Sequence, residues 1–230
     1  MTSFPLLVVR PEPGNAATVA AARSRGLTAL AAPLFRIEPV SWEPPPPERF
    51  DAIVFGSANA LRAGGAGLAS LARLPAYAVG EATAQAARAA GFEVVAAGNG
   101  GLRDLLPRLA ADRRRAILRL AGEDHVAVEP PPGLRIETLV IYAARPLPLP
   151  PDARRCLRQP AVVALHSGAA ARAFAEECDR ARLSRGGIAL ACLGQRIAEA
   201  AGDGWRTVRI APEPTETALL ALAVEMCESA

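Results

Sequence analysis

An internal repeat constrains the fold of this chain more than any other feature of its sequence. The run AIVFGSANA around Ser57 and the run VVALHSGAA around Ser167 each join a short apolar strand to a serine and to small residues that begin a helix. A second matched pair follows, with residues 76–92 (AYAVGEATAQAARAAGF) in the first copy and residues 190–205 (LACLGQRIAEAAGDGW) in the second. A duplicated α/β unit predicts two similar lobes with one cleft between them.

The match also extends upstream of the serines. Residues 33–39 (PLFRIEP) align with residues 140–146 (VIYAARP), which places Phe35 opposite Tyr142. Tyr142 is one of only two tyrosines and ends a strand-like run, so it faces the cleft if the chain has two lobes. An aromatic residue of the core or of a hinge is the alternative interpretation. Only the copy that holds Tyr142 offers a hydroxyl, and this makes an acid role available there.

Short apolar runs alternate with amphipathic, alanine-rich stretches along the whole chain. This alternation is typical of βαβ units around a parallel sheet. We expect helices between the strands, for example one that stops at Gly91 and its counterpart that stops at 202–204. The expected strands are residues 6–10, 52–55, 76–79, 93–96, 116–120, 135–142, 161–165, 189–193 and 207–210.

Two proline-flanked segments, 33–47 and 143–151, occupy equivalent positions in the two copies. Proline stiffens a connector and keeps it out of helices and central strands. We therefore expect these segments to connect the lobes. One lobe then consists of residues 1–36 and 147–230, and residues 40–142 form the other as an insertion.

Composition excludes several classes of protein. With 230 residues and 51% hydrophobic residues, the chain can bury a proper core. Its apolar runs stop well short of the roughly 20 residues that a membrane helix needs. The first residues pass directly into a strand without a basic leader, so we expect no signal peptide and a cytoplasmic protein.

The lysine, cysteine, histidine and arginine content restricts the possible functions further. The chain has no lysine, which removes Schiff-base chemistry and the phosphate-binding P-loop. Its four cysteines and two histidines lack the spacing of metal or redox motifs, so we expect reduced thiols and no metal. A formal charge of +3 with scattered arginines does not indicate nucleic acid. Arginine grips carboxylates, so a polyanionic small molecule remains a suitable ligand.

Ser57 and Ser167 each follow a strand of the predicted parallel sheets and precede a helix. Open α/β sheets bind ligands at this edge, where free backbone N–H groups favour anions. Each serine can equally be a plain helix cap, worth about 1 kcal/mol. Neither serine lies in G-x-S-x-G, so a serine nucleophile is not expected.

These motifs together resemble the uroporphyrinogen-III synthase family. The residues that carry the resemblance are VVRP at the start, DAIVFGSANAL, AYAVGEATAQAARAAGF, ILRLAG, LVIYAARP, VVALHSGAAARAF and the closing APEPTETALLALA. The resemblance spans essentially the whole chain. The order and spacing of the motifs are more specific than any one of them.

The resemblance implies two α/β lobes of HemD-like, flavodoxin-like form, joined by a two-stranded linker, with the substrate in the cleft. It implies a monomeric lyase without cofactor that cyclises hydroxymethylbilane to uroporphyrinogen III in tetrapyrrole and heme biosynthesis. Such enzymes lose water and invert ring D through a spiro intermediate. A transient contact with the upstream, bilane-forming enzyme fits this setting, and neither nucleic acid nor membrane is an expected partner.

The resemblance also assigns residues to the site. The family's tyrosine falls on Tyr142, which we expect to assist the departure of water. Its first-lobe serine and threonine fall on Ser57 and Thr83, and its second-lobe serine falls on Ser167. With the turn amides, the expected substrate-binding residues are Arg10, Ser57, Asn59, Thr83, Arg119, Gly122, Ser167 and Gly168. We expect Arg10 and Arg119 to lie at strand ends.

The chain departs from the family pattern at two places. Gly56 stands where many members have threonine, and Arg196 with Ile197 stands where the second-lobe turn often has a threonine pair. These changes remove side-chain hydroxyls, which is tolerable if binding runs mainly through backbone amides. A bilobed protein that binds an anionic, tetrapyrrole-like ligand without chemistry is the alternative function.

Overall fold

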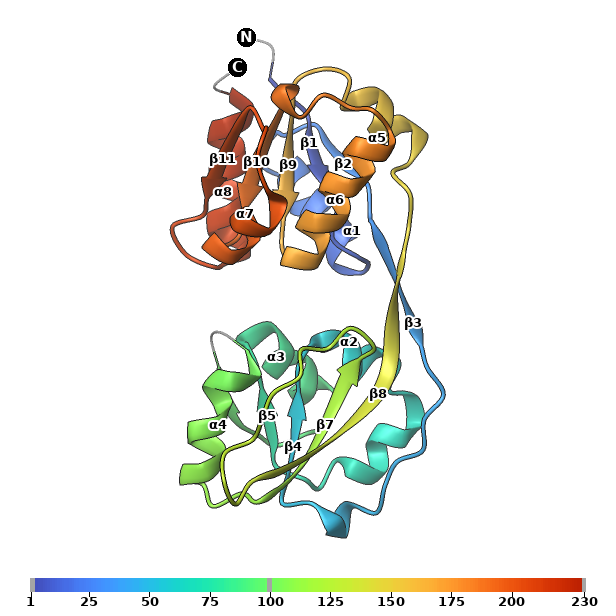
Figure 1. Cartoon of the computed structure of the whole chain (residues 1–230), viewed down its shortest axis with the longest axis vertical. Coiled ribbons are helices and arrows are strands. Elements are labelled where there is room, and N and C mark those ends of the chain that lie inside the picture. The colour runs from blue at the N-terminus through green and yellow to red at the C-terminus, as the bar shows by residue number, and fades with distance from the viewer. Residues whose placement is uncertain (1–2, 99–100, 229–230) are drawn as a thin grey trace. The chain divides into compact units, whose positions relative to one another are not determined.

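A computed structural model describes residues 3–98 and 101–228 of the chain (Figure 1). The chain divides into two compact units. Unit 1 consists of Met1–Arg36 and Arg145–Ala230, and unit 2 consists of Ile37–Ala144. Both divisions fall inside strands, one in β3 (Phe35–Pro39) and one in β8 (Arg135–Pro146).

Unit 1 is built on a five-stranded parallel sheet, in the order β11-β10-β9-β1-β2. Its central strands are entirely apolar because helices cover both faces of the sheet. Leu6 and Val8 contact the helices of one face, and Leu7 contacts those of the other. The strands are β1 (Leu6–Val8), β2 (Ala29–Ala31), β9 (Ala161–Leu165), β10 (Ile188–Cys192) and β11 (Thr207–Ile210).

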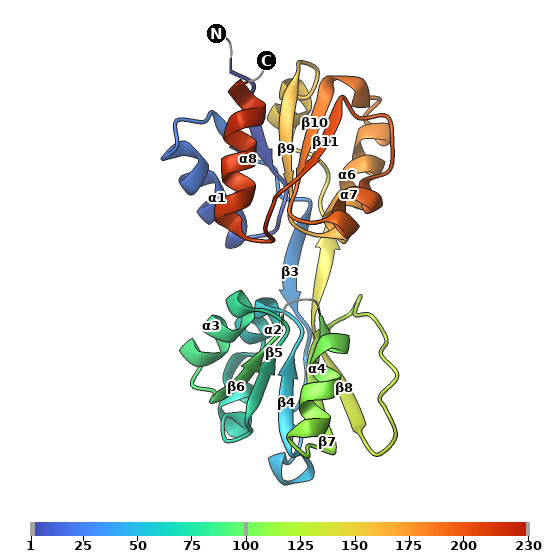
Figure 2. The ribbon, with the colours of Figure 1, turned by 90° about the vertical axis from the view of Figure 1, so that its left-hand side faces the viewer.

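The helices of unit 1 lie in two layers (Figure 2). One layer holds α1 (Gly14–Arg23) and α8 (Glu216–Glu228). The other holds α5 (Pro151–Cys156), α6 (Gly168–Arg180) and α7 (Gln195–Ala201), and a short 3-10 helix (Arg185–Gly187) precedes β10. Phe174 of α6 stacks on Trp205 with 5.5 Å between the ring centroids, and both rings pack on the core beneath α6 and α7.

Unit 2 is built on a six-stranded sheet, in the order β3-β8-β7-β4-β5-β6. Its further strands are β4 (Ala52–Phe55), β5 (Ala76–Ala78), β6 (Val94–Ala97) and β7 (Ala116–Gly122). The five strands from β8 to β6 are parallel, and β3 borders β8. Directly after β3, Val40 N donates to Ile141 O at 3.0 Å. A proline-rich stretch with one 3-10 turn (Pro47–Arg49) leads into β4.

Helices also cover both faces of the unit 2 sheet (Figure 2). One face carries α2 (Ala58–Ala63), a 3-10 helix (Gly65–Leu71) and α3 (Glu81–Ala89). The other face carries α4 (Leu102–Ala111), whose Leu105 and Leu109 pack on the sheet beside Tyr77.

The two sheets have the same strand order once the serine strands β9 and β4 are matched. The order β2-β1-β9-β10-β11 of unit 1 corresponds to β8-β7-β4-β5-β6 of unit 2, and all these neighbours are parallel. The chain forms β1 and β2 before β9, whereas it forms β7 and β8 after β4, β5 and β6. The repeat is therefore circularly permuted between the units.

The repeat extends to the backbone of the turns. Ser57 has φ −166° and ψ 148°, and Ser167 has φ −152° and ψ 152°. Gly80 and Gly194 share φ −170°, with ψ 166° and 165°. Each glycine carbonyl accepts the same pair of hydrogen bonds, from the amides three and four residues further on.

The predicted fold class is confirmed, and all nine predicted strands are present. Two further strands, β2 and β3, were not predicted. The segments 33–47 and 143–151 are partly regular rather than connectors throughout, because β3 and the end of β8 run through them. Within residues 3–98 and 101–228, no helix is long and apolar enough to cross a membrane.

Candidate functional site

Each sheet has one place where the strand order reverses its direction. In unit 1 it lies between β1 and β9, and in unit 2 it lies between β4 and β7. Doubly wound sheets bind their ligands beyond the carboxyl ends of the strands at such a point. Arg10, Ser167 and Ser57 each stand two residues beyond the end of β1, β9 and β4, and Gly122 is the last residue of β7. All four are among the residues that the sequence analysis assigned to the site.

In unit 2, Tyr142 lies directly against Gly122. A β-carbon on residue 122 would stand 2.6 Å from Cε2 and Cζ of the ring and 2.9 Å from the phenol oxygen. A bulge between Ala121 and Gly122 shifts the register of β7 against β8, so that Gly122 pairs with Tyr142. Bulges re-aim side chains and are common beside active sites. The ring is half-buried and packs on the core beneath α2 and α3.

Arg119 lies in the middle of β7 rather than at its end, so its expected position was wrong. The residue is 7% exposed, and its Nη1 donates to Val126 O at 2.9 Å while its Nε has no hydrogen-bond partner among the described residues. Burial lowers the pKa of Arg119, and the neighbouring Tyr142 opposes part of that change. No carboxylate in the described part of the chain pairs with this guanidinium. A buried guanidinium without a counter-ion is a strong place for an anion.

A short loop after β7 completes the surroundings of Tyr142. The amide of Glu123 donates to Tyr142 O at 2.9 Å, and His125 Nδ1 lies 2.9 Å from Gly122 O. Val126, held through its carbonyl by Arg119, has a 70% exposed residue surface. The loop is thus tied at three points to β7 and β8.

The other predicted residues of unit 2 lie at the starts of two helices that pack together, α2 and α3. Ser57 caps α2, because its Oγ accepts from Asn59 N at 3.2 Å. The side chain of Asn59 accepts from Arg62 at 3.0 Å. Thr83 is only 7% exposed and belongs to the buried side of α3. The capping interpretation of Ser57 is thus realised, and its hydroxyl keeps a proton to donate.

In unit 1, Ser167 caps α6 in the same way. Its Oγ accepts from Ala170 N at 3.2 Å, and the following Gly168 opens the helix. A β-carbon on Gly168 would find only ordinary contacts, at 3.4 Å or more. In the second turn, Arg196 is exposed, whereas Ile197 packs on the core beneath α6 and α7. This turn has no side-chain hydroxyl at these two positions, so hydrogen bonds to a ligand here depend on its backbone amides.

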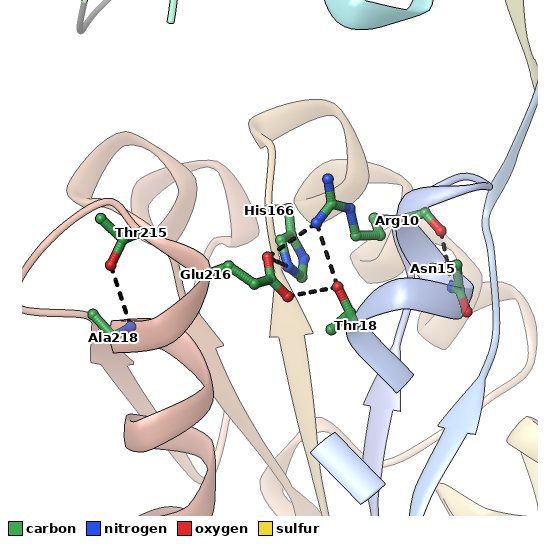
Figure 3. Close-up of polar contacts among 7 residues, drawn as sticks. All are labelled: Arg10, Asn15, Thr18, His166, Thr215, Glu216 and Ala218. Carbon is green, nitrogen blue, oxygen red and sulfur yellow. Dashed lines mark hydrogen bonds and ion pairs between the residues drawn. The ribbon is translucent and has the colours of Figure 1, made fainter. Parts of the chain in front are cut away.

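A polar cluster surrounds Glu216 at the carboxyl ends of β1 and β9 (Figure 3). We call Arg10, Thr18, His166 and Glu216 the Glu216 cluster. Glu216 Oε2 accepts from Arg10 Nη1 at 3.0 Å and lies 3.1 Å from His166 Nε2. Glu216 Oε1 accepts from the Thr18 hydroxyl at 2.5 Å, and Arg10 Nη1 also donates to Thr18 Oγ1 at 3.3 Å. Residues from three other segments of unit 1 thus contact one carboxylate.

The electrostatics of the cluster keep Glu216 ionised. Burial opposes ionisation, but hydrogen bonds from His166 and Thr18 and the charges of His166 and Arg10 outweigh it and lower the pKa of Glu216 from 4.5 to about 2. Glu216 is the first residue of α8, where the helix dipole also favours a carboxylate. The His166 side chain is 7% exposed, and its Nδ1 has no hydrogen-bond partner in the part of the chain that the structure describes.

The backbone around the cluster is fixed by further polar contacts. Asn15 Nδ2 donates to Val8 O at 2.7 Å and to Arg10 O at 2.9 Å, which holds the turn after β1. Thr215 Oγ1 accepts from Ala218 N at 3.3 Å and caps α8 (Figure 3).

Sequence reasoning missed His166, Glu216, Thr18 and Asn15. A signal existed for His166, because it stands at the end of a predicted strand directly before Ser167. Another existed for Glu216, since it follows Thr215 at the start of a helix. No local pattern marks Thr18 and Asn15, which meet the cluster only through the packing of α1 on β1.

Within the described ranges, no group of three or more His, Cys, Asp or Glu residues could hold a metal ion. The four cysteines are free thiols. Burial raises the pKa of Cys178 to about 12 and the pKa values of Cys192 and Cys227 to about 11, so these thiols stay protonated at neutral pH.

The fold defines a protein of two doubly wound, parallel α/β units, each with predicted site residues near the point where its strand order reverses. A family comparison then gives the identity. The family described as Uroporphyrinogen-III synthase HemD matches residues 16–221, so the chain belongs to the uroporphyrinogen-III synthase family. Members of this family are cyclising hydro-lyases. Among curated proteins, none matches the chain.

Solved structures with the same fold include two synthases. The uroporphyrinogen-III synthetase of Helicobacter pylori is 18% identical with a TM-score of 0.64, and the match covers 97% of this chain and 99% of that one. A mutant uroporphyrinogen III synthase of the extremely thermophilic bacterium Thermus thermophilus is 19% identical with a TM-score of 0.53, covering 95% and 97% of the two chains. These likenesses agree with the predicted fold class.

Proposed function

We propose that this chain is a uroporphyrinogen-III synthase, which cyclises hydroxymethylbilane to uroporphyrinogen III with loss of water and inversion of ring D. The observation that carries the proposal is its membership of the family over residues 16–221. It acts without metal or organic cofactor, because the acid and the anion-binding groups that the reaction needs are side chains and amides of the chain itself.

Tyr142 is the proposed acid. Its phenol donates a proton to the hydroxymethyl oxygen of the substrate. The carbon–oxygen bond then breaks, water departs, and the substrate becomes an azafulvene cation. The cation is attacked by the substituted carbon of ring D, and the spiro intermediate fragments and recloses with ring D inverted. The final carbon loses a proton, which returns to the phenolate. Arg119 supports this role, since a buried guanidinium beside Tyr142 favours the anion that proton donation leaves behind.

The carboxylates of the substrate bind to groups at or near the strand ends of each unit. In unit 2 we assign Ser57, Asn59, Gly122 and Arg119, with Thr83 as a buried support of the α3 turn. The Ser57 hydroxyl supports this assignment, because it accepts from an amide and still has a proton to donate.

In unit 1 we assign Arg10, Ser167 and Gly168 to the same task. Arg10 supports the assignment, because only its Nη1 is engaged within the described residues and its side chain is 33% exposed. Arginine grips carboxylates through parallel N–H donors, which suits a substrate rich in acetate and propionate groups.

We further propose that the protein works in the cytoplasm as a monomer, with transient contact to the enzyme that makes its substrate. Four free thiols support a reducing compartment. Transient contact is chemically sensible because hydroxymethylbilane closes spontaneously to the type I isomer when it is not captured.

The test is the isomer of the product. Purified protein is supplied with freshly made hydroxymethylbilane, and the oxidised products are separated by chromatography. Type III product is the expected result, whereas type I product alone overturns the proposal. Calorimetry that detects tight tetrapyrrole binding without catalysed closure would instead select a binding protein for an anionic ligand.

A further inference from the structure

Glu216 is partly exposed and makes contacts that the reaction described above does not use. It accepts hydrogen bonds from Arg10 and Thr18 and contacts His166, and these residues belong to three different segments of unit 1. Such convergence on one carboxylate orders the side chains around it. These contacts lower the pKa of Glu216 to about 2, so the carboxylate is ionised at neutral pH.

Arg10 is the residue whose side chain these contacts order most directly. Its Nη1 donates to both Glu216 and Thr18, which fixes the end of a long and otherwise flexible side chain. Its Nε and Nη2 make no hydrogen bond within the described residues. In Figure 3 one terminal nitrogen of Arg10 points away from Glu216 and Thr18. Glu216 and Thr18 therefore hold the guanidinium through Nη1, and its other nitrogens keep N–H groups that can donate to a ligand.

Gly14 gives a second, independent sign that this position of Arg10 is built into the fold. A β-carbon on residue 14 would stand 2.5 Å from Nε, 2.7 Å from Cζ and 2.8 Å from Nη2 of Arg10. The guanidinium can lie there only because residue 14, the first of α1, has no side chain. His166 completes the cluster from the side of β9, and its side chain is 7% exposed.

We infer that Glu216 is a positioning residue: with Thr18 and His166 it orients the Arg10 guanidinium so that the free donors of Arg10 bind a carboxylate of the substrate. This inference rests on the proposed function, since it takes Arg10 as a ligand of the substrate. Glu216 itself does not touch the substrate. A guanidinium that is already ordered loses less freedom when it binds a carboxylate.

The test compares two variants and a control with the wild type by steady-state kinetics of type III product formation. Glu216→Gln removes the charge that holds Arg10, and Gly14→Ala displaces Arg10 through its β-carbon while leaving every charge in place. We expect each to raise KM by about tenfold with kcat within about twofold of the wild type, since hydrogen bonds to charged groups have that size. Thermal unfolding and near-UV circular dichroism report whether each variant folds.

Glu225→Gln is the matched control. Glu225 lies on the same helix, α8, and pairs with Arg209 at 2.8 Å on an exposed surface. It should leave KM unchanged. A folded Gly14→Ala variant keeps the inference testable even if Glu216→Gln fails to fold.

A double-mutant cycle separates positioning from a general structural role. If Glu216 acts through Arg10, the variant Arg10→Met/Glu216→Gln has the same KM as Arg10→Met alone. Additive effects, or an unchanged KM in folded Glu216→Gln and Gly14→Ala, overturn the inference. A wild-type protein that forms no type III product overturns the proposed function instead, so the two failures are distinguishable.

Discussion

Tyr142 and Gly122 are in such close contact that any side chain at position 122 would displace the phenol. A β-carbon there would stand 2.6 Å from Cε2 and Cζ of the ring, a distance that real β-carbons do not show. The contact exists because a bulge brings the two residues into register on neighbouring parallel strands. The orientation of the proposed acid is thus set by a glycine on the strand beside it.

We predict that Gly122→Ala lowers kcat. The added methyl group displaces the Tyr142 ring from its position beside residue 122. A displaced general acid lowers kcat on the order of a hundredfold. The measurement is steady-state turnover to type III product, together with the midpoint of thermal unfolding. Gly187→Ala is the control, because its β-carbon would meet nothing within 4 Å. Full activity in folded Gly122→Ala would show that the position of the ring does not matter.

Tyr142→Phe should slow turnover while the fold stays intact. The ring still packs on the core beneath α2 and α3, but the proton donor is gone. We expect kcat to fall by about a hundredfold, the usual effect of losing a general acid. Single-turnover kinetics with unchanged near-UV circular dichroism would check this. A variant that closes the bilane at the wild-type rate would remove the acid role from Tyr142.

The fold was largely predictable because the strands of a doubly wound sheet are short, apolar and separated by helical stretches. β4 and β9, for example, have the predicted bounds 52–55 and 161–165. β2 escaped prediction because ALA between two small-residue segments has no periodicity. β3 (FRIEP) escaped because it is an edge strand with polar residues, and its pairing with β8 depends on a partner about 100 residues away in the sequence.

The site was predictable only where local sequence determines position. Ser57 and Ser167 follow strands directly, so their places at helix starts could be derived. The contact of Tyr142 with Gly122 depends on a bulge, which no short motif encodes. The Glu216 cluster depends on how α1 and α8 pack on one face of a sheet, and that packing joins residues about 200 positions apart.

Arg119→Met should bind substrate less well without a large loss of stability. Methionine keeps much of the length of the side chain and removes a buried charge that has no counter-ion in the described structure. We expect the free energy of unfolding to change by about 1 kcal/mol or less, because a fitting apolar residue replaces a poorly solvated ion. KM should rise about tenfold with the loss of a charged donor.

Steady-state kinetics and urea unfolding measure the two effects of this change. Arg103→Met, on an exposed position of α4, is the matched control and should alter neither quantity. If Arg119→Met lowers stability by several kcal/mol and leaves KM unchanged, the guanidinium serves only to hold Val126.

Alkylation should distinguish one cysteine from the other three. Cys156 is partly exposed, whereas Cys178, Cys192 and Cys227 are fully buried and have pKa values raised to about 11 or 12. Iodoacetamide reacts with thiolates, so at pH 7.5 the native protein should be modified slowly and first at Cys156. Peptide mass spectrometry identifies the site. Equal labelling of all four thiols without denaturant would contradict the burial of these residues.

Glu216 should contribute stability that disappears in acid. Its pKa is about 2 in the folded protein and 4.5 without these contacts, so the ionised form stabilises the fold above about pH 4.5 and this contribution is lost as the pH falls toward 2. Because its side chain is 38% exposed, solvent screening reduces the effect to about 1 kcal/mol. Urea unfolding of the wild type and Glu216→Gln should therefore differ by about that amount at pH 6 and converge toward pH 2. A difference that stays constant across this range would mean that the carboxylate is not held by Arg10, Thr18 and His166 in solution.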